Sequence, residues 1–267
     1  MNKLFITLVS FLLVLSSKTS FAVIHQSFTP VCSATLTANE MCRTTPDKFQ
    51  ITIYEMGLCE SNPYGTTTSG NTTFDSSTCS VTFTNSTGFT TDVAAALASG
   101  TPVTMTGTDT RPKNGTYKYP YMLMGKVFTT RKTMTVGGVT YYNKSDGGAT
   151  QVASDLADYA ESLNTFAAGC DPYYINSPLD VGTISGYLAT NAKAIDTTAG
   201  GLGCANATRL VGVINLTTPF EITDRTVGLT FTFNLTNNGV QVQADGAGAP
   251  DSFGSGPFSG YFTVTNN

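Results

Sequence analysis

The chain has 267 residues, with 14 lysines and arginines against 18 aspartates and glutamates. This acidic balance argues against nucleic acid as a partner, because phosphate binding requires clustered basic side chains that release counterions. Only 12% of the residues are charged and about a quarter are serine or threonine, a composition that favours β-strands with hydroxylated outer faces.

Residues 1–22 are predicted to be a secretory signal peptide. Lys3 precedes a short apolar run over Leu4–Leu15, and a polar stretch ends at Ala22. The run is shorter than the roughly 20 apolar residues that a membrane-spanning helix needs. We therefore expect cleavage after Ala22, with an uncleaved interfacial anchor as the alternative. The mature chain would lose Lys3 and Lys18, carry a net charge of −6 (12 basic against 18 acidic residues) and have no transmembrane segment. It would be periplasmic or extracellular, at the cell surface.

The cysteine content predicts disulfides, because all six cysteines follow the leader in a chain bound for an oxidising compartment. The sequence leaves the pairing open. We expect neighbours to pair, because short-range partners meet most easily. A structural zinc site is the weaker alternative, since no two cysteines have the close spacing of zinc ligands and the only histidine is His25. The cysteines are Cys32, Cys42, Cys59, Cys79, Cys170 and Cys204.

A β-sandwich region is predicted over residues 46–143, after an extended amino-terminal segment at 23–45. Phe49, Ile51 and Ile53 alternate with polar residues, which is the two-residue period of a half-buried strand. That strand ends at Cys59 and a second begins at Cys79. The apolar patch at 93–97 is long enough for one or two helical turns.

The stretch GTYKYPYMLMG at residues 115–125 places three tyrosines two residues apart. A strand over 117–129 would carry these rings on one face together with Leu123 and Val127. Burial of that face is the favoured interpretation, because the aromatic residues run on into aliphatic ones. The alternative is a ligand platform. Pro120 has no N–H to donate to a ladder, so we expect this strand at an edge or a bulge. The candidate platform residues are Tyr117, Tyr119, Tyr121, Tyr141 and Tyr142.

Gly137-Gly138 predicts a tight β-hairpin between strands at 133–136 and 139–142. A helix and loop insert is expected over 144–208. Within it, apolar residues recur every three or four positions over 151–166, which is typical of an amphipathic helix. A short helix is also expected near 184–194. The C-terminal region, 209–267, is predicted to hold five strands that could complete the same sandwich, with a loop at 245–260 before the last strand.

No catalytic residue, cofactor or metal site is predicted. A Ser-His-Asp mechanism needs a histidine, and the mature chain has only His25 near its start. A carboxylate-dependent glycoside hydrolase could use Glu55, Glu221 or Asp224 as its two acidic groups. This is weak evidence, because a chain with 18 acidic residues will always contain some pair at a suitable distance. The loop at 245–251 could offer oxygen ligands to calcium, although it lacks the acid density of a dedicated site.

The order of an alternating strand FQITIYEMGLC, a VAAALASGTP patch and a strand opening with GTY resembles transthyretin-type (prealbumin-like) β-sandwich modules of secreted bacterial surface proteins. The resemblance covers residues 46–143. It implies a Greek-key sandwich with a structural or binding role, in which Tyr117 packs inward. The segment at 151–208 departs from that pattern.

These observations predict a mainly β protein, an antiparallel Greek-key β-sandwich with one inserted amphipathic helix. The expected function is a secreted, non-enzymatic cell-surface or matrix protein that acts through protein contacts, in adhesion or structural assembly. The alternatives are a carbohydrate-binding module that uses surface tyrosines, and the carboxylate-dependent glycoside hydrolase. The expected partner is a protein surface or a second copy, with a glycan as the alternative.

Overall fold

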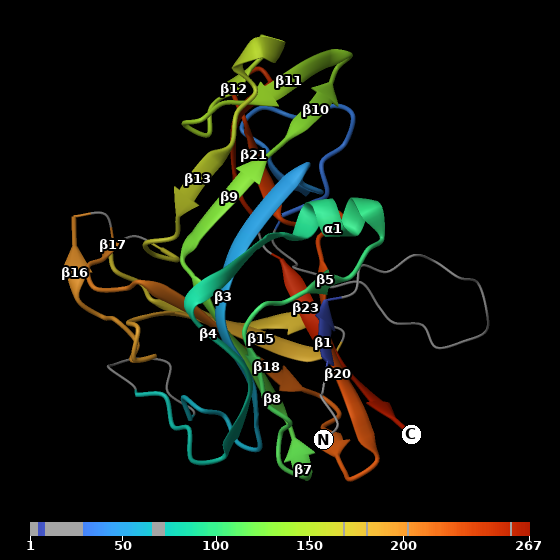
Figure 1. Ribbon diagram of the computed structural model, residues 1–267. Helices are drawn as coiled ribbons and strands as arrows, with labels where there is room; N and C mark the ends of the chain where they lie inside the picture. Colours follow the sequence, from blue (N-terminus) through green and yellow to red (C-terminus); the bar gives the residue numbers. More distant parts are fainter. Residues whose placement is uncertain are drawn as a thin grey trace.

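The computed structural model describes residues 5–8, 29–65, 73–167, 169–179, 181–201, 203–256 and 258–267 (Figure 1). This part of the chain is mainly β, as predicted, and contains one α-helix and one 3-10 turn. Within it, no helix has the length and apolar character needed to cross a bilayer. Most of the predicted leader, and residues 23–28, lie outside the described residues.

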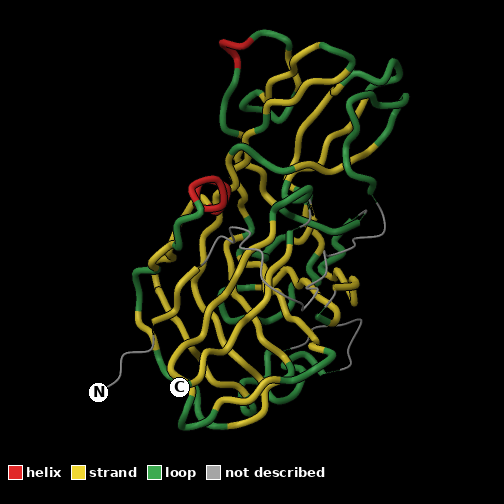
Figure 2. The backbone as a smooth tube through the Cα atoms, turned by 90° about the vertical axis from the view of Figure 1, so that its right-hand side faces the viewer, coloured by secondary structure: helices red, strands yellow, loops and turns green. Residues whose placement is uncertain are grey.

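The largest sheet lies in the centre of the molecule (Figure 1), and Figure 2 shows strands throughout the described chain from a direction at 90° to the first. Its strands pair in an antiparallel manner. The order is β13 (Tyr159–Ser162), β9 (Val127–Arg131), β3 (Lys48–Cys59), β8 (Tyr119–Gly125), β18 (Arg209–Leu216), β15 (Gly182–Ala189) and β14 (Tyr173–Leu179); β4 (Cys79–Asp92) also pairs with β3 and with β6 (Thr108–Asp109).

A second sheet has four strands. Its order is β23 (Ser259–Asn266), β20 (Thr226–Asn234), β1 (Phe5–Leu8) and β5 (Val103–Thr104). The β1–β20 pair is parallel, whereas the other two pairs in this sheet are antiparallel. Among the described residues, β5 joins this sheet through β1 alone, and β1 lies in the predicted leader.

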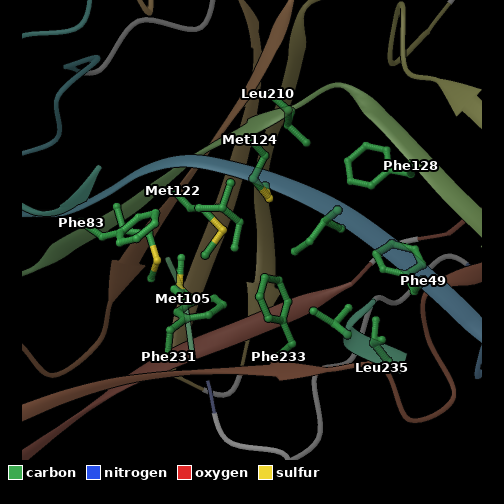
Figure 3. Packing of buried hydrophobic residues seen from close by; sticks show 14 of the residues in the cluster. Phe49, Phe83, Met105, Met122, Met124, Phe128, Leu210, Phe231, Phe233 and Leu235 are labelled. Atoms are coloured by element: carbon green, nitrogen blue, oxygen red, sulfur yellow. The ribbon is translucent and has the colours of Figure 1, made fainter. Parts of the chain in front are cut away.

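The two sheets pack face to face through the main apolar core (Figure 3). Phe231 and Phe233 of β20 lie opposite Met122 and Met124 of β8, and all four side chains are buried. The alternation of the sequence explains this arrangement, because side chains two residues apart on a strand share one face. Leu229 of β20 and Leu235, which directly follows this strand, are buried as well.

Smaller sheets form the remainder of the fold. One has the order β2 (Met41–Thr44), β21 (Val240–Ala244) and β22 (Pro250–Ser255); another has β10 (Thr133–Val136), β11 (Val139–Asn143) and β12 (Ala149–Thr150). Two-stranded pairs join β19 (Phe220–Ile222) to β7 (Gly115–Tyr117), and β16 (Ala199–Gly200) to β17 (Gly203–Cys204). Figure 1 shows β10, β11, β12 and β21 gathered at one end of the molecule.

The predicted hairpin and short helix are both present. Gly137 and Gly138 connect β10 to β11 with φ values of +58° and +80°, a left-handed conformation that glycine adopts readily. The helix is α1 (Val93–Ser99), which begins after Asp92 and ends at Gly100 with φ +64°. The Asp92 carboxylate accepts the backbone N–H groups of Ala94 and Ala95, so it caps the helix.

The amphipathic helix predicted over 151–166 is wrong. The segment forms only a 3-10 turn, η1 (Ala153–Asp155), and the strand β13, which pairs with β9. Asp158 precedes β13 and binds Lys48 and Arg131 across the sheet, each at 2.5 Å. The segment contains two serines, two aspartates and one each of tyrosine, asparagine and threonine, all of them weak helix formers. Pairing with the edge of β9 therefore outweighs the helical period.

Three further predictions about the second half are corrected. The segment expected as a short helix at 184–194 lies largely in β15, which pairs with both β14 and β18. The region 144–208 therefore contributes strands to the main sheet instead of forming a helix and loop insert. The loop expected at 245–260 contains β22. Near the start of the chain, residues 41–44 of the segment predicted to be extended form the strand β2, which does not contradict that prediction.

Pro120 does not place its strand at an edge. β8 lies between β3 and β18, and both of its faces are buried. Its ladder with β18 begins only at Tyr121, so the missing N–H of Pro120 falls outside that ladder. Val127, expected on the buried face, is instead 46% exposed.

The six cysteines form the bonds Cys32–Cys42, Cys59–Cys79 and Cys170–Cys204. This is the neighbour pairing favoured from the sequence. Cys59 and Cys79 are register partners at the joined ends of β3 and β4. Each bond therefore closes a short segment of the chain locally.

Candidate functional site

The most unusual backbone pairing in the described residues is that of β1, which we call the strand slot. Four residues of β1 pair with β20, from Phe5 opposite Gly228 to Leu8 opposite Phe231. On its other side Thr7 and Leu8 pair with Thr104 and Val103 of β5. The slot is therefore the space between β20 and β5 that one extended strand fills.

The floor of the slot is apolar. Leu229 and Phe231, the register partners of Ile6 and Leu8, are buried with exposures of 0% and 5%. Met105, two residues beyond Val103, is also buried in the main core. Figure 3 shows Met105 beside Phe231 and Phe83 at one end of that core. A strand in the slot therefore has buried hydrophobic side chains of its neighbouring segments beside it, on the face of the sheet that is turned toward the core.

An apolar hollow of about 500 Å³ lies next to the main core, with Met124, Phe128 and Leu210 of that core in its lining. Its lining is mostly hydrophobic and comes from several strands, among them β8, β9, β15 and β18 of the main sheet. The lining includes Met124, Phe128, Ile184, Leu210 and Phe258.

A polar cleft of about 650 Å³ lies on another part of the main sheet. Arg209 lies over the ring of Tyr54, with its guanidinium carbon 3.7 Å from the ring centroid. Glu55 and the amide side chain of Asn191 also line this cleft. A guanidinium stacked on an aromatic ring is held in place, which gives the cleft one fixed positive group.

Glu55 is engaged by two partners. Its Oε1 accepts hydrogen bonds from the Tyr121 hydroxyl at 2.5 Å and from the Lys193 ammonium at 2.7 Å. Lys193 also lies over the ring of Phe74, 4.5 Å from its centroid. Burial raises the pKa of Tyr121, and the neighbouring Glu55 carboxylate raises it further, so the hydroxyl remains a donor. This cluster ties β3 and β8 to the loop after β15.

The tyrosines suggested as a ligand platform divide into buried and partly exposed groups. Tyr117, Tyr121 and Tyr141 are buried, with exposures of 2%, 1% and 8%. The Tyr117 hydroxyl donates to the carbonyl of Lys113 at 2.9 Å. These three rings belong to separate apolar clusters and present no open face to a ligand.

Tyr119 and Tyr142 are only partly buried, but they lie in different sheets. Tyr119 is on β8 and Tyr142 is on β11, where it pairs with Thr133. The structure does not bring the five candidate tyrosines together as one row. The inward packing expected for Tyr117 agrees with its burial.

The carboxylates suggested for hydrolysis are also dispersed. Glu55 is on β3 of the main sheet, whereas Glu221 is exposed on β19, in a different sheet. Asp224 accepts a hydrogen bond from the Asn114 side chain at 2.7 Å. Glu55 is the only one of the three that lines the polar cleft.

In the loop suggested for calcium, the first acidic residue, Asp245, stabilises the turn in which it lies. Asp245 accepts the backbone N–H groups of Ala247 and Ala249 at 2.8 Å and 2.9 Å. These hydrogen bonds lower the pKa of Asp245 and hold its own turn. Among the described residues, no group of three or more histidine, cysteine, aspartate or glutamate side chains could hold a metal ion.

Comparisons with known proteins add no relative: no protein-family model, curated protein or solved structure matches this chain. Function must therefore be inferred from the geometry of the strand slot and its surroundings. Sequence reasoning missed the slot because it treated the leader as a separate unit. The available signal was the pair Ile6 and Leu8, two residues apart, which has the spacing of one strand face.

Proposed function

We propose that this protein is exported, is not an enzyme, and works at the cell surface or in a matrix through contacts with other proteins, in adhesion or structural assembly. The observation that carries the proposal is the four-stranded sheet, in which β1 comes from the predicted leader and separates β20 from β5. Removal of the leader would leave two strand edges with unpaired backbone groups. Such edges pair readily with another extended chain.

Other features support an exported, structural role. Three disulfides brace the chain, and such bonds persist mainly in oxidising compartments. The face-to-face packing of the two main sheets supports a β-sandwich, for which the transthyretin-type Greek-key order remains our proposed topology. The engagement of Glu55 by Tyr121 and Lys193 favours a structural role for that carboxylate.

The test uses the full chain in its native cells. A lysine-reactive cross-linker is added to intact cells, and the protein is purified under denaturing conditions and examined by mass spectrometry. We expect an amino terminus at Val23 and covalent adducts with other proteins. An exported chain without such adducts, or a chain that stays inside the cell, would contradict the proposal.

The enzymatic alternative needs a separate measurement. Glu55→Gln is compared with the wild type on a panel of polysaccharides, using release of reducing ends. We expect no release by either protein. Release by the wild type that Glu55→Gln abolishes would favour the glycoside hydrolase instead.

A further inference from the structure

We propose that the strand slot of the mature protein accepts an extended strand from a partner polypeptide, which runs parallel to β20 and carries aliphatic side chains at alternate positions. This inference rests on the proposed function and specifies the site and the chemistry of its partner. It concerns the backbone edges of β20 and β5 and the apolar floor between them.

The slot is a full strand wide. β20 and β5 both pair with β1, on opposite sides, so they lie two strand spacings apart, or roughly 10 Å. Backbone hydrogen bonds need donor and acceptor atoms about 3 Å apart. The two strands therefore cannot pair directly when β1 is removed, and each presents an open edge.

The chemistry of the occupant follows from the register. Ile6 and Leu8 are the partners of the buried residues Leu229 and Phe231, while Thr7 alternates with them opposite Thr230. A strand with aliphatic residues at two such positions would cover the floor of the slot. Burial of two aliphatic side chains would stabilise the bound strand, and the backbone ladder adds to this.

The new amino terminus does not match this requirement. Residues 23–28 read VIHQSF, in which every pair two residues apart contains a polar member. A second copy of this chain would offer the same segment, with Gln26 between Ile24 and Phe28 on one face. A different polypeptide with an aliphatic alternation therefore fits the slot better than the amino terminus of this chain or of its copy.

The experiment uses the oxidised mature chain, residues 23–267, and a fluorescently labelled peptide KLFITLVS, which repeats residues 3–10. We expect saturable binding of one peptide per chain and a higher melting temperature. Hydrogen exchange should slow in 228–231 and 103–104 on binding. The matched control peptide carries Ile6→Asp and Leu8→Asp, and we expect its affinity to be at least about tenfold lower, because burial of an unpaired charge is costly.

A fusion supplies a second measurement that does not depend on peptide solubility. The register places Asn266, at the end of β23, opposite Thr226 near the start of β20, and Phe5 opposite Gly228 nearby. The end of β23 and the start of β1 thus lie at the same end of β20. A glycine-serine linker followed by KLFITLVS after Asn267 should fill the slot, raise the melting temperature and abolish uptake of the labelled peptide.

Three results would overturn the inference. The first is that the mature chain fails to take up the peptide and the fusion melts at the same temperature as the unfused chain. The second is that 228–231 are already protected in a monomer, which would show that the chain fills its own slot. The third is that the mature chain alone forms oligomers in which these residues are protected, which would identify a second copy as the occupant.

The two proposals can fail independently. Absence of peptide uptake together with cross-linked partners in cells would reject the slot and leave the proposed function intact. Peptide uptake by a protein that forms no cross-links in cells would reject the proposed function and leave the inference about the strand slot intact.

Discussion

The hydroxyl of Tyr121 on β8 donates a 2.5 Å hydrogen bond to Oε1 of Glu55 on β3, and the same oxygen accepts the ammonium of Lys193. One carboxylate thus connects two neighbouring strands to a distant loop. Tyr121→Phe removes one donor and leaves the ion pair in place. We expect it to lower the free energy of unfolding by about 1.5–3 kcal/mol, the range for a hydrogen bond to a charged group.

Chemical denaturation measures this change. Tyr142→Phe is the matched control, because Tyr142 is only partly buried and lies in another sheet. The control should stay within about 0.5 kcal/mol of the wild type. A loss for Tyr121→Phe within that same range would show that the Tyr121 hydroxyl adds no stability.

Alkaline pH should destabilise the protein through buried tyrosines. Burial raises the pKa of both Tyr64 and Tyr121 above the usual value near 10. The folded state therefore retains these protons while the unfolded state releases them, and stability is lost as the pH rises above about 10. A double variant, Tyr64→Phe with Tyr121→Phe, should show a shallower loss between pH 9 and pH 11. Parallel pH profiles would contradict this assignment.

Gly57 allows the ring of Tyr121 to lie against β3. A Cβ atom at Gly57 would come within 2.5 Å of the Tyr121 ring. Because that ring is buried and hydrogen-bonded, it cannot move away cheaply, and we expect Gly57→Ala to cost about 1–3 kcal/mol. Gly246→Ala is the control, since its Cβ would meet no atom within 4 Å. Thermal melts of the two variants test the difference.

The disulfides should differ in their contribution to stability. Their sequence separations are 10, 20 and 34 residues for Cys32–Cys42, Cys59–Cys79 and Cys170–Cys204. Loop-closure entropy then gives contributions of about 2.7, 3.3 and 3.8 kcal/mol in the same order. Paired Cys→Ala variants, compared by urea denaturation, should lose stability in that order. A reversed order would show that native-state contacts outweigh loop entropy.

The ion pairs of Asp158 should be lost in acid. Burial acts to raise the pKa of Asp158, but hydrogen bonds and charge from Lys48 and Arg131 outweigh it and hold the pKa below its usual value. The stabilisation is therefore present above about pH 4 and disappears as the pH falls through the lowered pKa. Asp158→Asn should be less stable than the wild type at pH 7 by up to about 1 kcal/mol, because the side chain is partly exposed. The two proteins should converge at pH 2.

Local signals in the sequence predicted local structure well. Gly137-Gly138 specified a hairpin through backbone conformation alone, and the alternation of Phe49, Ile51 and Ile53 specified the buried face of β3. The pairing of each cysteine with its neighbour also follows from the short distance between the two cysteines along the chain. In each case the decisive interaction lies within a few dozen residues along the chain.

Interactions across long sequence separations could not be predicted in this way. β13 is a strand because β9 offers it an edge and because Lys48, 110 residues from Asp158, supplies a countercharge. The pairing of β1 with β20 joins residues more than 200 positions apart. Glu55 likewise finds Lys193 at a separation of 138 residues. Hydrophobic period alone contains no information about these partners.

The three sulfur bridges also determine how the chain can be oxidised. Each bridge joins consecutive cysteines, so that no bridge encloses or overlaps another. In a polypeptide that emerges from a translocation channel with its amino end first, every thiol meets its native partner before the next pair arrives. Stepwise oxidation in order of emergence then yields the correct bonds without reshuffling.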